Sequence, residues 1–87
     1  MNFFPLQIEK ALLKIPGVLP NYRLIVQDHD GTKKLRVEVE AEAGVTGHQV
    51  AKVLKETLGF TPEGDVYAPG ALPRAEGKAK RVFFEKA

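Results

Sequence analysis

The segment Tyr22–Glu40 has the sequence YRLIVQDHDGTKKLRVEVE. Its first part, YRLIVQ, has strand character, and its last part, KKLRVEVE, alternates apolar with charged residues. That alternation is typical of a strand with one buried face. Asp30-Gly31 between them favours a tight turn, because both residue types tolerate positive φ. The segment therefore predicts a β-hairpin.

Helices are predicted on both sides of the hairpin. In NFFPLQIEKALLKIPG, residues 2–17, Pro5 suits the first helical turn and Pro16-Gly17 stops the segment. From about Gly47, GHQVAKVLKETLGF carries an apolar stripe at helical spacing, and Gly59 suits the position after a helix. The periodic apolar positions are Ile8, Leu12 and Ile15 in the first helix and Val50, Val53, Leu54 and Leu58 in the second.

Two further short segments, DVYA at 65–68 and RVFFE at 81–85, resemble strands. The expected order is therefore α-β-β-α-β-β. Such a chain predicts an α+β fold, a small and mainly antiparallel sheet with two helices on one face. We expect residues 1–87 to form a single domain, because a chain of 87 residues has room for one modest core.

Composition limits the class of protein. The chain is 44% hydrophobic and 28% charged, which is ordinary for a globular domain. It has no Cys, so disulfides, thiol nucleophiles and thiolate metal sites are excluded, and a cytoplasmic location is expected. The N-terminus lacks the pattern of a signal peptide, and no apolar run is long enough to span a membrane. The net charge of +2 gives little long-range field.

Several polar groups are of the residue types that form functional sites. Asp28, His29 and Asp30 resemble metal ligands in type, but their position favours a hairpin turn, and no metal site is predicted. His48 has no second His, Cys or Ser at a useful spacing, so a solvated or helix-capping role is expected. Alternation along the strand places three glutamates, Glu38, Glu40 and Glu42, on one face of the sheet, which is expected to be exposed to solvent. Four phenylalanines are expected in the core or at the sheet edge: Phe3, Phe4, Phe83 and Phe84.

The most basic stretch is LPRAEGKAKR, residues 72–81. It is not a P-loop, because the first glycine of that motif is missing and Ala79 replaces the hydroxyl residue after Lys78. Gly77 permits close backbone approach, and Lys78 can extend an ammonium group toward an anion. The residues alone leave two alternatives, a solvated loop or an anion-binding loop.

Four blocks, in order, resemble the C-terminal domain of phenylacetate–CoA ligases, a branch of the adenylate-forming acyl-CoA synthetases. They are NFFPLQIEKALLKIPGVLPNYRLIV, LRVEVE, LKETLGF and YAPGALPRAEGKAKRV. The most specific are NFFPLQIE and PRAEGKAKRV. The chain departs from the family pattern at Ala75, where Ser or Thr is usual, and near Phe84-Glu85, where an Asp is expected.

The resemblance implies that Lys78 is the adenylation lysine, which stabilises charge as a carboxylate attacks the α-phosphate of ATP. It implies that Gly77 lets the loop reach the nucleotide and that Arg74 or Arg81 holds the loop or meets phosphate. ATP, Mg²⁺ and CoA belong to the assembled enzyme, and no cofactor is expected on this domain alone. After adenylation the same domain would rotate on a hinge and admit CoA.

The ATP loop, substrate pocket and hinge of the family have no counterpart here, and the chain begins just after the expected hinge. Three hypotheses follow. The first is a lid domain that works with a separately encoded N-terminal adenylating domain in an aryl-acid CoA ligase reaction. The second is a non-catalytic ligand-binding or regulatory relic. The third, least favoured, is a nucleic-acid-binding module using the cluster Lys78, Lys80 and Arg81; a homo-oligomer is left open, and no membrane partner is expected.

Overall fold

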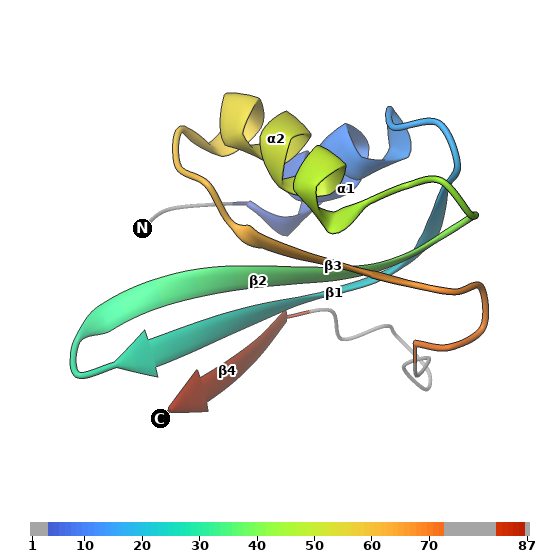
Figure 1. The fold of residues 1–87 in the computed structure, drawn as a ribbon. Helices are drawn as coiled ribbons and strands as arrows, with labels where there is room; N and C mark the ends of the chain where they lie inside the picture. Colours follow the sequence, from blue (N-terminus) through green and yellow to red (C-terminus); the bar gives the residue numbers. More distant parts are fainter. Residues whose placement is uncertain (1–3, 73–81, 87) are drawn as a thin grey trace.

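Two helices cover one face of a four-stranded sheet in the computed structural model, which describes residues 4–72 and 82–86 (Figure 1). The predicted α+β architecture with both helices on one face is confirmed. In chain order the elements are α1 (Pro5–Leu13), β1 (Val18–His29), β2 (Thr32–Ala41), α2 (Gly47–Leu58), β3 (Glu63–Tyr67) and β4 (Val82–Lys86).

The predicted hairpin forms the centre of the sheet. β1 and β2 pair antiparallel up to His29 opposite Thr32, and Asp30 and Gly31 between them have φ of 52° and 86°. Positive φ at both turn residues matches the right-handed twist of the flanking strands. The side chain of Asp28 also accepts a hydrogen bond from Gly31 N at 2.9 Å. The turn interpretation of Asp28–Asp30 is therefore confirmed.

The sheet is mixed, so the expectation of a mainly antiparallel sheet is wrong. The strand order is β3-β2-β1-β4, with β3 parallel to β2 and β4 parallel to β1. The physical reason for the first parallel pair is α2. A helix between two neighbouring strands carries the chain back to the end of the sheet where the first strand began, so the second strand runs in the same direction.

The helix ends follow local rules. Pro5 begins α1, where its missing N–H is not needed. The Thr46 side chain precedes α2 and accepts a hydrogen bond from Gln49 N at 3.1 Å, while Gly59 ends α2 at φ 82°. His48, which was expected to be solvated or to cap this helix, is exposed, and Thr46 provides the cap.

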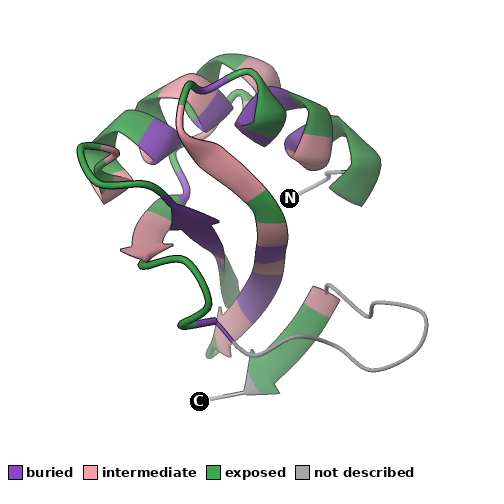
Figure 2. Cartoon of the chain, turned by 90° about the vertical axis from the view of Figure 1, so that its right-hand side faces the viewer, coloured by how far each residue is buried: buried purple, intermediate pink, exposed green. Residues whose placement is uncertain are grey.

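The core lies between the helices and the sheet (Figure 2). Alternate strand residues face the helices because successive side chains of a strand point to opposite sides. The buried cluster comprises Ile8, Ala11, Leu12 and Ile15, then Tyr22, Leu24, Val26, Leu35, Val37 and Val39, and finally Val50 and Leu54. No helix in the described part of the chain is both long and apolar enough to cross a membrane.

Aromatic side chains lie mostly outside this core. Phe83 and Phe84 belong to β4, the edge strand beside β1, as predicted. Phe4, however, caps the start of α1 and is 72% exposed, so its expected place in the core or sheet edge is wrong. The exposed position follows from its place one residue ahead of the helix, where its side chain is not on the buried stripe. Phe3 lies outside the described residues.

Candidate functional site

The residues that the sequence indicates for function lie in one connection, between β3 and β4. Lys78, Gly77, Arg74 and Arg81 are all outside the described residues, so their predicted roles stay predictions. The structure does describe the residues on which this connection begins and ends. Those two attachments lie on the central strands of the sheet.

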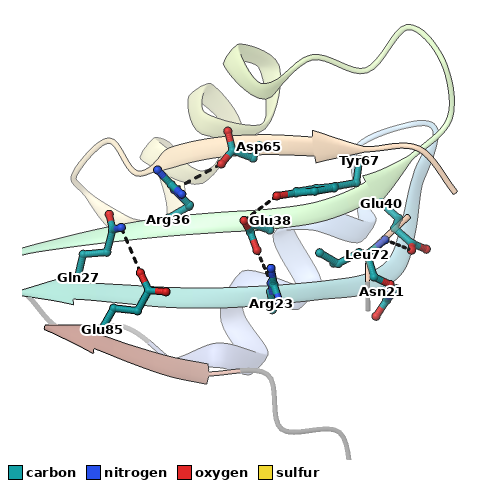
Figure 3. A network of polar contacts seen from close by, with 10 residues as sticks. All are labelled: Asn21, Arg23, Gln27, Arg36, Glu38, Glu40, Asp65, Tyr67, Leu72 and Glu85. Carbon is teal, nitrogen blue, oxygen red and sulfur yellow. Dashed lines mark hydrogen bonds and ion pairs between the residues drawn. The ribbon is translucent and has the colours of Figure 1, made fainter. Parts of the chain in front are cut away.

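The first attachment is Leu72. After β3 the chain turns at residues 68–71, where Ala71 N donates to Ala68 O at 2.9 Å and Gly70 has φ of 83°. Leu72 is then 2% exposed and donates its backbone N–H to Glu40 Oε2 at 3.0 Å. Its carbonyl oxygen accepts from Asn21 Nδ2 at 3.1 Å (Figure 3). Side chains of β1 and β2 thus hold both backbone polar groups of Leu72.

The second attachment is Val82, the first residue of β4. It lies opposite Leu24 in the parallel pairing of β4 with β1 and packs against the core. Asn21 and Leu24 are close neighbours on the same strand. The segment that carries Lys78 therefore begins and ends beside one short stretch of β1.

A polar network lies on the same face of the sheet as Glu40, the face opposite the helices (Figure 3). Arg23 pairs with Glu38 Oε1, and Tyr67 Oη donates to Glu38 Oε2 at 2.8 Å. The pKa of Tyr67 is raised mainly by this hydrogen bond to Glu38. Burial of the phenol and the negative charge of Glu38 raise that pKa further. The network links β1, β2 and β3.

Weaker polar contacts extend this face toward the hairpin turn. Arg36 lies 3.4 Å from both Glu63 and Asp65, and Gln27 lies 3.4 Å from Glu85. The side chains of Arg36, Glu63 and Asp65 are 37%, 52% and 46% exposed. These contacts are accessible to water, and each is worth little to stability.

The glutamate row corrects a prediction. Alternation placed Glu38 and Glu40 opposite Val37 and Val39, which is right, but both glutamates are buried, at 3% and 0% exposed. Only Glu42, beyond the end of β2, is exposed as expected. The expectation failed because it treated this face as uncovered. Glu38 has partners on two neighbouring strands, and the chain returns across the sheet to place Leu72 on Glu40.

Asn21 and Glu40 were missed as part of the site. Asn21 precedes the apolar alternation of its strand, so the pattern predicts no role for it, and the same alternation places Glu40 on a face expected to be in solvent. The available signal was the hairpin itself, which brings the beginning of β1 beside the end of β2. That signal does not reveal that Leu72 lies against them.

Hollows on the described surface include two shallow ones. One, of about 220 Å³, is lined by Val26, Asp28, Lys33, Phe84 and Glu85, and the other, of about 250 Å³, by Lys33, Lys34, Leu35, Phe60, Thr61 and Glu63. Sites for small molecules usually measure about 300–1,000 Å³. Within residues 4–72 and 82–86 no three His, Cys, Asp or Glu side chains gather as metal ligands. Neither of these two hollows reaches the size usual for a nucleotide or CoA site.

Comparison with known proteins adds independent information. The model of a family described as "AMP-binding enzyme C-terminal domain" matches residues 1–86. Phenylacetate-coenzyme A ligase of Escherichia coli (strain K12) is 32% identical over 93 residues, which cover 95% of this chain and 21% of the ligase. The corresponding Thermus thermophilus ligase is 32% identical over 107 residues, covering 95% of this chain and 24% of the ligase. The chain thus spans about a fifth to a quarter of the length of these curated relatives.

Solved structures with the same fold include small and large proteins. A domain of phenylacetate-coenzyme A ligase from Bacteroides vulgatus superposes with a TM-score of 0.79 at 25% identity, covering 99% of this chain and 87% of that one. A 2-hydroxyisobutyryl-CoA ligase in complex with 2-HIB-AMP and CoA gives a TM-score of 0.80 at 20% identity, covering 95% of this chain and 19% of that one. The second likeness concerns the fold alone.

Proposed function

The chain belongs to the family of AMP-binding enzyme C-terminal domains, and we propose that it supplies Lys78 to the adenylation step of an acyl-CoA ligase. The partner in this reaction is a large adenylating domain that holds ATP and an aryl carboxylic acid. The proposal is the same whether that domain is joined to this chain or is a separate polypeptide.

The observation that carries the proposal is the extent of the match. It spans residues 1–86, so the segment with Lys78 lies within it, and the ligases that match are four to five times as long as the part this chain covers. Binding of ATP and CoA is therefore assigned to the assembled enzyme.

The proposed chemistry is electrostatic. When a carboxylate attacks the α-phosphate, negative charge grows on the phosphoryl oxygens and on the departing pyrophosphate. The Nζ ammonium group of Lys78, taken out of water between the two domains, stabilises that charge more in the transition state than in the ground state. No proton transfer is required of it.

The test is a graft. In the first arm, the present chain replaces the matching C-terminal segment of the Escherichia coli phenylacetate-coenzyme A ligase. In the second arm, the ligase is shortened by that segment, and the present chain is added as a separate polypeptide. Adenylation is measured by pyrophosphate exchange, and thioester formation is measured separately from preformed acyl-adenylate and CoA. We expect the chain to restore adenylation in at least one arm.

Two variants make the test specific. Lys78→Ala should reduce adenylation by about 100-fold or more, the usual effect of removing one transition-state donor, and leave thioester formation much less affected. Lys52→Ala, which removes an exposed lysine from α2, should leave both steps near wild type. A graft that restores neither step, or a Lys78→Ala graft as active as the Lys52→Ala graft, would contradict the proposal.

A further inference from the structure

We propose that Asn21 and Glu40 are positioning residues for adenylation, because they fix the point from which the segment carrying Lys78 leaves the sheet. The inference rests on the proposed function of Lys78. Neither residue is expected to touch the substrate. Their action passes through the backbone of Leu72.

The geometry is a two-point attachment. Leu72 N lies 3.0 Å from Glu40 Oε2, and Leu72 O lies 3.1 Å from Asn21 Nδ2. One bond fixes the position of a backbone group, whereas two bonds to opposite groups of the same residue also fix its orientation. Side chains of two paired strands therefore fix both the position and the orientation of the Leu72 backbone.

Burial makes this attachment rigid. Glu40 is 0% exposed and Leu72 is 2% exposed, so water does not compete for their hydrogen bond. Leu72 also lies outside the main apolar cluster between helices and sheet. Placing a carboxyl group in such a position is unfavourable unless it is hydrogen-bonded. An apolar residue at position 40 would cover Leu72 equally well but could not direct its backbone.

The far end of the segment strengthens the argument. Val82 pairs with Leu24 of β1, the strand that also provides Asn21. Leu72 and Val82, the described residues on either side of the segment, are thus both attached to the same strand. A catalytic group must be held to within about 0.5 Å of its productive position, which makes the attachment of its segment matter.

The activity test uses the graft described above. Asn21→Leu removes the amide at similar volume, and Glu40→Met removes the carboxyl group. We expect each to lower kcat for adenylation about tenfold or more while thioester formation from preformed acyl-adenylate stays within about threefold of wild type. Glu40→Gln keeps an oxygen that can accept from Leu72 N, and it should restore most of the adenylation rate.

Tyr67→Phe is the matched control. It breaks a hydrogen bond to Glu38, a buried glutamate on the same face, whereas the backbone N–H of Leu72 is held by Glu40. It should therefore lower stability without changing adenylation. Equal losses in Tyr67→Phe and the two positioning variants, or equal losses in both half-reactions, would show a merely structural role and overturn the inference.

A second measurement does not depend on activity. The rate of tryptic cleavage between Arg74 and Ala75 should rise about five- to tenfold in Asn21→Leu and Glu40→Met, and should not rise in Tyr67→Phe. Unchanged cleavage in both positioning variants would overturn the attachment itself. An inactive wild-type graft would instead remove the proposed function, and the cleavage rates would still decide whether Asn21 and Glu40 hold the segment.

Discussion

Tyr67 Oη lies 2.8 Å from Glu38 Oε2 and donates a hydrogen bond to it from the neighbouring strand (Figure 3). Arg23 meets the other oxygen of the same carboxylate. Glu38 is only 3% exposed, so its carboxylate is stabilised by a hydrogen bond from a phenol and an ion pair with a guanidinium group instead of by water. The phenol must keep its proton to donate this bond, and the pKa of Tyr67 is raised above 10.0 as a result.

This relationship predicts a pH dependence. Because the pKa of Tyr67 is higher in the folded than in the unfolded chain, its stabilisation is complete below about pH 10 and is lost as the pH rises through the folded value. Tyr67→Phe should lower the free energy of unfolding by about 1–2 kcal/mol at neutral pH. Urea unfolding of both proteins should show a constant difference up to about pH 9 and a shrinking one above about pH 10. A difference that does not shrink at high pH would contradict this assignment.

The two arginine pairs on this face should differ in strength. Arg23→Met leaves the buried carboxylate of Glu38 without its cation, and we expect a loss of about 2–3 kcal/mol, less than for a fully buried pair because Arg23 is 32% exposed. Arg36→Met removes contacts to the exposed Glu63 and Asp65 and should cost less than about 1 kcal/mol. Chemical denaturation of both variants compares them directly, and equal losses would refute the distinction.

Local rules were sufficient for the elements of the fold. Asp30-Gly31 specified the hairpin turn and Gly59 the end of α2, because each needs positive φ that few residues adopt. Alternation assigned Val37 and Val39 to the core correctly. The direction in which β4 pairs was not available locally, because nothing within the strand distinguishes parallel from antiparallel pairing to β1.

In the candidate site, too, local sequence patterns predict some residues, whereas others depend on segments distant in the sequence. A sequence motif predicts a role for Lys78, which stays a prediction, whereas the contacts of Asn21 and Glu40 depend on Leu72, which is 51 and 32 residues away in sequence. The glutamates Glu38 and Glu40 were expected in water for the same reason. Periodicity identifies the face on which a side chain lies, but it does not say which distant segment covers that face.

The cap of α2 gives a simpler prediction. Thr46 Oγ1 accepts from Gln49 N at 3.1 Å, which satisfies one of the free N–H groups at the start of the helix. Thr46→Ala should lower the free energy of unfolding by about 1 kcal/mol, and Thr46→Ser should recover most of it. Thr61→Ala, at an exposed position after the helix, is the control and should change the thermal unfolding midpoint little. Equal effects of the two alanine substitutions would argue against the cap.

Gly47 and Gly64 allow the start of α2 to lie directly against β3. A methyl group on Gly64 would lie 2.5 Å from Gly47 O, and one on Gly47 would overlap Gly64 O. Both obstacles are backbone atoms, so the helix or the strand would have to move. Either glycine-to-alanine substitution should therefore cost about 2–3 kcal/mol.

The control for this close approach is Gly31, which has φ of 86° and no atom within 4 Å of the position that a Cβ would take. Gly31→Asn should cost less than about 1 kcal/mol, because Asn tolerates positive φ and meets no obstacle there. Urea denaturation of the three variants separates the two roles of glycine. If Gly64→Ala and Gly31→Asn lost equal stability, backbone freedom rather than helix–strand contact would be the reason for Gly64. A loss confined to Gly47→Ala and Gly64→Ala would instead show that α2 and β3 need this contact to close the sheet edge beside β2.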